Sequence, residues 1–96
     1  MTPEGKIQRY AQKSFKAIGG LVRKVSYEGR RGCADLLVVL PGGIVLFIEV
    51  KRSSSTAADA HQVREHDRLK RRGANVFVVG SVEDVNRVVA EFTPVH

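Results

Sequence analysis

The sequence predicts one α/β domain in which helices flank a mixed four-stranded sheet, with elements in the order helix, three strands, helix, strand, helix. Two observations support this fold. Apolar, strand-like runs within 32–51 flank the connection Pro41-Gly42-Gly43, and so short a loop joins antiparallel neighbours in a hairpin. A helical pattern then leads to another apolar run at 75–80, and a helical crossover between two strands favours parallel pairing.

The first helix is expected at 3–18, with Thr2 as its N-cap and Gly19-Gly20 as its stop. Its apolar side chains recur at helical spacing, so they share one face that we expect to enter the core. Those side chains are Ile7, Ala11, Phe15 and Ile18. The other elements are a strand at 21–27, a helix from a capping box at Thr56 and Asp59 to about Arg72, a fully buried strand at 75–80 and a last helix capped by Ser81.

The hairpin brings two carboxylates together. If Leu40 pairs with Ile44, Asp35 falls directly opposite Glu49. Opposed side chains have Cβ atoms about 5 Å apart, and like charges there destabilise a sheet. A divalent cation would compensate, because hard ions such as Mg2+ bind carboxylate oxygens together with water and phosphate. Lys51 follows Glu49 by two residues and shares its face, so a positive charge is expected beside this metal site.

A simpler interpretation makes Asp35 and Glu49 solvent-facing charges, with Lys51 as their salt-bridge partner, since such surface pairs are common. The neighbouring side chains favour the metal site instead. By strand alternation, the same face carries several large apolar side chains, and a solvated face is not usually so apolar. These side chains are Leu37, Val39, Val45 and Phe47.

The chain carries a net charge of +6, from 16 Lys and Arg against 10 Asp and Glu, which favours an anionic partner such as nucleic acid over a merely basic protein. The first helix has a basic stripe and the loop before Asp35 has two arginines, and each group either contacts phosphate or is solvated. Glu4 projects from the core face of the first helix, either as an acid near the site or as a first-turn residue that the helix dipole favours. The basic residues are Lys6, Arg9, Lys13 and Lys16 in the stripe and Arg30 and Arg31 in the loop.

The second predicted helix begins a few residues after Lys51, so Gln62 near its start is expected to reach back toward the metal face. His66 lies on the same helical face as Gln62. His61 and His66 suit catalysis by residue type, but a helical histidine is more often structural or exposed, and we expect that role for both.

Cysteine content and hydropathy restrict the kinds of site and the cellular location that the sequence predicts. Cys33 is the only cysteine, which excludes an internal disulfide and a cysteine-based zinc cluster. No apolar run approaches the roughly 20 residues of a membrane span, and the first residues are polar and charged rather than signal-like. We therefore expect a cytoplasmic protein with no membrane partner.

Four features follow one another along the chain: an acidic residue in the first helix, a Gly-x-x-Asp step, a Glu-x-Lys step and an early Gln in the second helix. They are Glu4, Gly32 to Asp35, Glu49 to Lys51, and Gln62. Together with the predicted order of elements, this pattern resembles the PD-(D/E)XK nuclease superfamily, most closely its VRR-NUC branch in the stand-alone form similar to phage-borne members. The resemblance implies a single VRR-NUC-type nuclease domain over 1–96 with a restriction-endonuclease-like fold.

The resemblance also implies roles for individual residues. Asp35 and Glu49 would be metal ligands, with the backbone carbonyl of Val50 as a further ligand. Lys51 would orient the attacking water and stabilise charge on the phosphate. One departure is Ala34, where the family usually has a proline that stiffens the backbone and takes no part in the chemistry. The other matched positions are Gln62, a supporting residue, and Glu4, which contributes directly or through water.

By the same resemblance, we expect a Mg2+-dependent endonuclease that hydrolyses phosphodiester bonds in DNA, with Mn2+ able to replace Mg2+. Stand-alone members look like homodimeric resolvases of Holliday junctions, so branched DNA, a homodimer and the cytoplasm of a bacterial host are expected here. Arg52 and the basic residues named above would contact the DNA. The alternatives are a nickase or flap nuclease of the same fold, and a non-catalytic module that binds nucleic acid.

Overall fold

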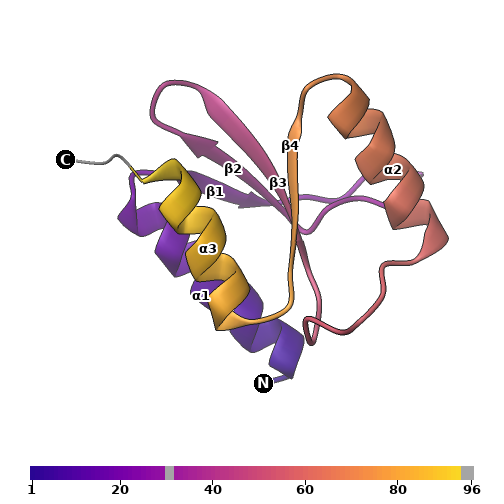
Figure 1. Ribbon diagram of the computed structural model, residues 1–96, viewed down its shortest axis with the longest axis horizontal. Coiled ribbons are helices and arrows are strands. Elements are labelled where there is room, and N and C mark those ends of the chain that lie inside the picture. Colours follow the sequence, from indigo (N-terminus) through magenta and orange to yellow (C-terminus); the bar gives the residue numbers. More distant parts are fainter. Residues whose placement is uncertain (30–31, 94–96) are drawn as a thin grey trace.

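The computed structural model describes residues 1–29 and 32–93. Its elements follow the predicted order αβββαβα (Figure 1). Within the described residues, no helix is long and apolar enough to cross a membrane. The elements are α1 (Pro3–Ala17), β1 (Leu21–Lys24), β2 (Leu36–Leu40), β3 (Ile44–Val50), α2 (Ala60–Arg71), β4 (Asn75–Val79) and α3 (Val82–Phe92).

The four strands form one mixed sheet in the order β1-β2-β3-β4. The pairs β1/β2 and β2/β3 are antiparallel, whereas β3 and β4 are parallel and are connected through α2, as predicted. The hairpin register is also as predicted, because Leu40 pairs with Ile44 and Leu36 pairs with Ile48. The next position along each strand is Asp35 on one side and Glu49 on the other, so the register brings the two acids level.

One face of the sheet is covered by α1 and α3, which lie side by side in Figure 1. Alternate residues of β2 and β3 point into this layer, where they meet the apolar face of α1. Burying each large side chain stabilises the fold by about 1.5–3 kcal/mol. The fully buried residues of the layer include Phe15 on α1, Leu36 and Val38 on β2, and Leu46 and Ile48 on β3.

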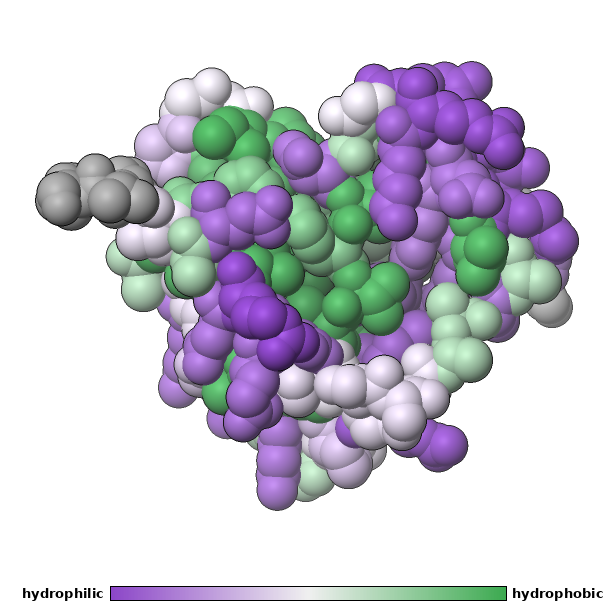
Figure 2. Space-filling model, viewed as in Figure 1, coloured by the Kyte–Doolittle hydropathy of each residue, from purple (hydrophilic) through white to green (hydrophobic). Residues whose placement is uncertain are grey.

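The opposite face of the sheet is only partly covered. There α2 contacts β4, whereas Leu21, Val45 and Val78 are 51%, 37% and 47% exposed. The prediction that β4 is fully buried is therefore wrong, because Val78 points to the side that α1 and α3 leave open. Figure 2 shows hydrophobic residues gathered around β4, between the polar surfaces of α3 and α2.

The first strand is shorter than predicted. β1 ends at Lys24 rather than at Tyr27. The N–H of Val25 still donates to the backbone carbonyl of Asp35 at 3.0 Å, so the segments that carry β1 and β2 remain paired one residue beyond β1. This bond holds the backbone of Asp35 in place at the start of β2.

The second helix begins later than its predicted capping box. The N-cap is Asp59, whose carboxylate accepts the N–H of Gln62 at 2.9 Å, while the Gln62 side chain accepts the N–H of Asp59 at 3.3 Å. The predicted box at Thr56 and Asp59 is wrong, because the Thr56 hydroxyl is instead hydrogen-bonded to the Ser53 hydroxyl at 2.8 Å. Gln62 is thereby fixed at the start of α2.

The chain after Lys51 packs tightly against the end of β4. The N–H of Lys51 donates to the carbonyl of Val79 at 2.8 Å. At Gly80, a Cβ atom would lie only 2.3 Å from the carbonyl carbon and oxygen of Ser53, so the two backbones approach too closely for any side chain. This contact sets the path of the chain from Lys51 toward α2.

We predict that Gly80→Ala lowers the free energy of unfolding by about 1–3 kcal/mol, because the added methyl group must displace the backbone of Ser53. Urea unfolding followed by circular dichroism measures the change. Gly5→Ala is the matched control, since its Cβ would meet only side-chain atoms of Met1 and Thr2 and since helices favour alanine over glycine. Wild-type stability of Gly80→Ala would contradict this packing.

Candidate active site

Asp35 lies immediately before β2 and is half buried. Its Oδ2 accepts the backbone N–H of Val50 at 2.6 Å, which ties the start of β2 to the end of β3. In an extended strand the N–H and C=O of one residue point to the same side, so the Val50 carbonyl also points toward the side of Asp35. A carboxylate and a backbone carbonyl therefore lie together at the open end of the hairpin.

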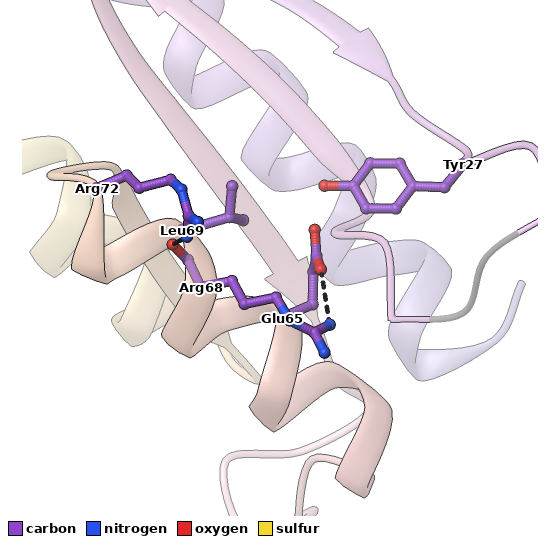
Figure 3. A pocket seen from close by; sticks show the side chains of 5 residues that line it. All are labelled: Tyr27, Glu65, Arg68, Leu69 and Arg72. Carbon is purple, nitrogen blue, oxygen red and sulfur yellow. Dashed lines mark hydrogen bonds and ion pairs between the residues drawn. The ribbon is translucent and has the colours of Figure 1, made fainter.

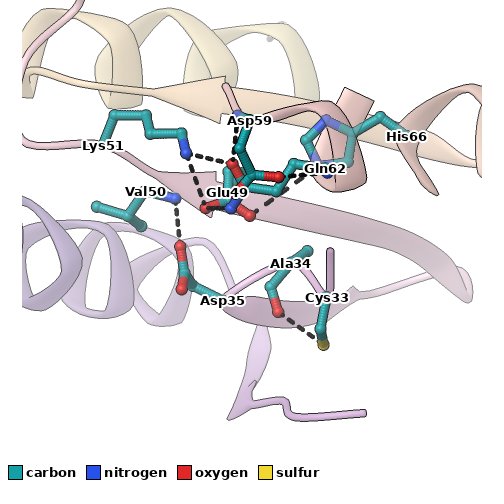
Figure 4. Close-up of polar contacts among 9 residues, drawn as sticks. All are labelled: Cys33, Ala34, Asp35, Glu49, Val50, Lys51, Asp59, Gln62 and His66. Atoms are coloured by element: carbon teal, nitrogen blue, oxygen red, sulfur yellow. Dashed lines mark hydrogen bonds and ion pairs between the residues drawn. The ribbon is translucent and has the colours of Figure 1, made fainter. Parts of the chain in front are cut away.

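Glu49 is the most deeply buried charged residue of this region, with only 2% of its surface exposed. Its two oxygens have different surroundings (Figure 4). Oε2 accepts a hydrogen bond from the Gln62 amide nitrogen at 2.7 Å and lies 3.6 Å from the Lys51 ammonium. Oε1 is buried and, among the described residues, has no hydrogen-bond partner.

Gln62 connects Glu49 with Lys51. Its amide nitrogen donates to Glu49, and its amide oxygen accepts a hydrogen bond from the Lys51 ammonium. The same amide oxygen caps α2 through the N–H of Asp59. One side chain thus anchors the helix and holds the acid and the ammonium at fixed positions. Gln62 contacts Glu49 on the face of the sheet toward which the sequence predicts that it reaches.

The carboxylate pair has a strong electrostatic signature. Burial first, and then the charge and hydrogen bonding of Asp35, raise the pKa of Glu49 to about 8, although Lys51 and Gln62 act to lower it. The protein's own groups therefore do not offset the repulsion between the two acids. A proton can relieve this repulsion near neutral pH, and a cation bound between the carboxylates would do so in its place.

His66 is buried beside the same carboxylate. Its Nε2 lies 4.0 Å from Oε1 of Glu49, and the residue is 6% exposed. Burial, together with the charges of Lys70 and Lys51, lowers the pKa of His66. A buried position agrees with the structural role expected for His66, and the structure adds that this position is next to Glu49. The signal in the sequence is the four-residue spacing from Gln62, which puts both side chains on one face of α2.

A cleft of about 300 Å³ lies between α2 and the chain that follows β1. Tyr27 faces the α2 side chains across it (Figure 3). Glu65 and Arg68 form an ion pair at 3.5 Å on the helix side. Glu65, which lines the cleft, is the neighbour of His66 in the sequence. Its lining residues are Tyr27, Glu65, Arg68, Leu69 and Arg72.

The other predicted residues that the structure describes lie outside this cluster. Glu4 is exposed in the first turn of α1, so the expectation that its carboxylate points inward is wrong, and among the described residues no hydrogen bond or ion pair joins it to Asp35 or Glu49. Its position in the first turn suits the helix dipole. Lys6, Arg9 and Lys13 are exposed along α1, Arg52 is exposed next to Lys51, and Arg30 and Arg31 lie outside the described residues.

Comparison with known proteins places this geometry in a family. No family model matches the chain. A curated relative, "Putative nuclease p44" from Acyrthosiphon pisum secondary endosymbiont phage 1, is 35% identical over 86 residues, which span 90% of each chain. A solved structure described as "VRR_NUC domain" has a TM-score of 0.93 and 54% identity, covering 96% of this chain and 99% of that chain. The chain belongs to the VRR-NUC family. Membership confirms the resemblance drawn from the sequence, and the VRR-NUC structure has the same αβββαβα fold.

We predict that Glu49→Gln stabilises this VRR-NUC protein at alkaline pH when divalent ions are removed with EDTA. The pKa of Glu49 is raised by folding, so its contribution to stability is present below about pH 4.5 and is lost as the pH rises through about 8. The melting temperature of the wild type should therefore fall relative to that of Glu49→Gln between about pH 5 and pH 9.

Exposed Glu91→Gln on α3 is the control and should show no such trend. A difference in melting temperature between Glu49→Gln and the wild type that stays constant across this range would contradict the raised pKa.

Proposed function

We propose that this VRR-NUC protein is a metal-dependent endonuclease that hydrolyses phosphodiester bonds in DNA, with branched DNA as its preferred substrate. The observation that carries the proposal is the placing of Asp35 and Glu49 at the open end of the hairpin, with Lys51 joined to Glu49 through Gln62. Two acids and an ammonium held beside a nucleic-acid backbone are suited to phosphoryl chemistry, which needs both a cation site and charge stabilisation. The name of the phage relative, a nuclease, supports the same class of reaction.

The residues at the hairpin end suit a hard divalent cation. Asp35, Glu49 and the Val50 carbonyl would hold Mg2+, or Mn2+ in its place. Among residues 1–29 and 32–93, no group of three or more His, Cys, Asp or Glu side chains could hold a metal alone. Mg2+ suits such an incomplete set, because it keeps several waters and shares substrate phosphates. When bound, the ion would polarise the scissile phosphate and lower the pKa of a coordinated water.

The protein's own groups would perform the remaining tasks. The Lys51 ammonium would orient the attacking water and stabilise the negative charge that grows on the phosphate. Gln62 would hold the Lys51 ammonium in a fixed position beside Glu49, from which it could act on the substrate. Glu4, exposed at the start of α1, would act only through water.

Surface charge supports a nucleic-acid substrate. The net charge of +6 favours binding to phosphates and makes the affinity dependent on salt. Arg52 is exposed immediately after Lys51 and would contact phosphates close to the cut. Exposed basic residues of α1 would contact the backbone farther away, together with the loop arginines that lie outside the described residues. These residues are Lys6, Arg9, Lys13, Arg30 and Arg31.

A homodimer would match a branched, symmetric substrate such as a Holliday junction, since a two-fold axis relates two active sites as it relates two strands of the junction. The uncovered face of the sheet supports this assembly. It carries the exposed apolar side chains of Leu21, Val45 and Val78, which a second copy of the chain would bury. The phage source of the relative is consistent with action in the cytoplasm of a bacterial host.

We predict that Asp35→Asn and Lys51→Met each reduce cleavage of a labelled four-way junction at least about 100-fold while leaving most DNA binding intact. The wild type, in Mg2+ or Mn2+, should make symmetric cuts that EDTA abolishes. Lys70→Met, which removes an exposed ammonium of α2, is the control and should cut normally.

A flap, a plain duplex and single-stranded DNA complete the substrate panel. If a flap or duplex is cut but the junction is not, the protein is still a nuclease. Its substrate is then that of a flap nuclease or nickase rather than that of a junction resolvase. Junction binding without cleavage in either metal would instead support a non-catalytic binding module.

We predict that Val45→Asp converts a dimer into a monomer, because it places a charge within the apolar face that the second copy would cover. Analytical ultracentrifugation measures the change in mass. The control is Val82→Asp, at a similarly exposed valine on α3, which should leave the dimer intact. A wild-type monomer, or a dimer that tolerates Val45→Asp, would contradict this interface.

A further inference from the structure

Two buried polar atoms face each other without hydrogen bonds. They are Oε1 of Glu49 and Nε2 of His66, which lack partners among the described residues and lie 4.0 Å apart. Buried polar atoms are rarely left unpaired, because an unmade hydrogen bond in the interior costs the desolvation of the group. One atom is an acceptor and the other is a ring nitrogen that can donate, so the two form a natural pair.

The distance between Oε1 of Glu49 and Nε2 of His66 limits how the two atoms can interact. At 4.0 Å the two atoms are too far apart for a hydrogen bond and too close for a water molecule in line between them. A shift of the Glu49 carboxylate of about 1 Å would bring them into direct contact. The catalytic cluster as described above does not use His66, and it leaves this one oxygen of Glu49 unassigned.

The other oxygen of Glu49 is already engaged on the opposite side. Oε2 accepts the Gln62 amide and lies near Lys51, whereas Oε1 is directed to His66, as Figure 4 shows. Gln62 and His66 are one helical turn apart on α2, so one rigid helix presents a group to each oxygen. Such an arrangement can fix the rotation of a carboxylate.

We propose that His66 is a positioning residue that donates its Nε2–H to Oε1 of Glu49, so that only Oε2 is left for the metal, through the lone pair that the bond from Gln62 does not use. This inference rests on the proposed function, since it concerns the same metal site. A neutral imidazole carries one N–H. The donor role assigns the proton to Nε2.

The consequence is selectivity for small ions. Mg2+ demands near-ideal octahedral geometry, whereas Ca2+ readily accepts both oxygens of one carboxylate. A carboxylate whose second oxygen is held by His66 can bind through one oxygen only, which suits Mg2+. Groups that hydrogen-bond to a ligating side chain commonly change metal affinity about 10–100-fold when they are lost.

The test measures metal binding without DNA or turnover. Electron paramagnetic resonance reports free Mn2+, and displacement of bound Mn2+ by Mg2+ or Ca2+ gives the affinity of each ion. We expect His66→Leu to weaken Mg2+ binding about tenfold and to leave Ca2+ binding unchanged or tighter. His66→Gln, which keeps a side-chain N–H donor of similar reach, should retain the wild-type ratio of affinities to within about threefold.

The matched control is His61→Gln, an exposed histidine on the same helix, which should behave as the wild type. If His66→Leu does not fold, His66→Asn replaces it, because its shorter amide keeps polarity but stops short of Oε1. Equal losses for Mg2+ and Ca2+, or no loss for either, would overturn the role of His66 and leave the proposed function standing. If the wild type does not bind Mn2+, or binds it equally well when Glu49 is replaced, both the role of His66 and the proposed function would be overturned.

Discussion

Repulsion between two acids is the constraint around which this small fold is arranged. Asp35 and Glu49 stand level at the open end of a hairpin, and Glu49 is buried in an apolar sheet. Each acid receives partial compensation from a different element: the Val50 N–H for Asp35, and Gln62 and Lys51 for Glu49. The raised pKa of Glu49 indicates that this compensation is incomplete. A site that remains short of positive charge is suited to recruit a cation together with its substrate.

The topology of the fold places each of these groups at the end of the hairpin. A tight turn fixes the register of β2 and β3, and the parallel pairing of β3 with β4 requires a crossover in which α2 returns over the active-site face. The start of α2 is anchored by the capping box of Asp59 and Gln62, so a residue with a structural task is also the link to Lys51. The close backbone contact at Gly80 completes this arrangement from the side of β4.

The sequence predicts most of this arrangement, because local rules govern it. The short turn sets the hairpin register, strand alternation puts Lys51 on the face of Glu49, and the closeness of α2 to Lys51 makes the reach of Gln62 foreseeable. Features that depend on how layers cover the sheet were not predictable in the same way. The exposure of Val78 and the burial of His66 depend on the position of α2, and the solvation of Glu4 depends on how α1 packs. The position of the cap of α2 was not predicted either, because the Thr56 hydroxyl bonds to Ser53 and Asp59 caps the helix in its place.

Membership of the VRR-NUC family and the geometry of the carboxylates converge on one claim, that the end of the hairpin is a divalent metal site. Anomalous X-ray scattering from crystals grown with Mn2+ tests it most directly. We predict an anomalous peak between the carboxylates of Asp35 and Glu49, next to the backbone carbonyl of Val50. A map with no peak at that position, or with Mn2+ bound only elsewhere on the protein, would contradict the claim.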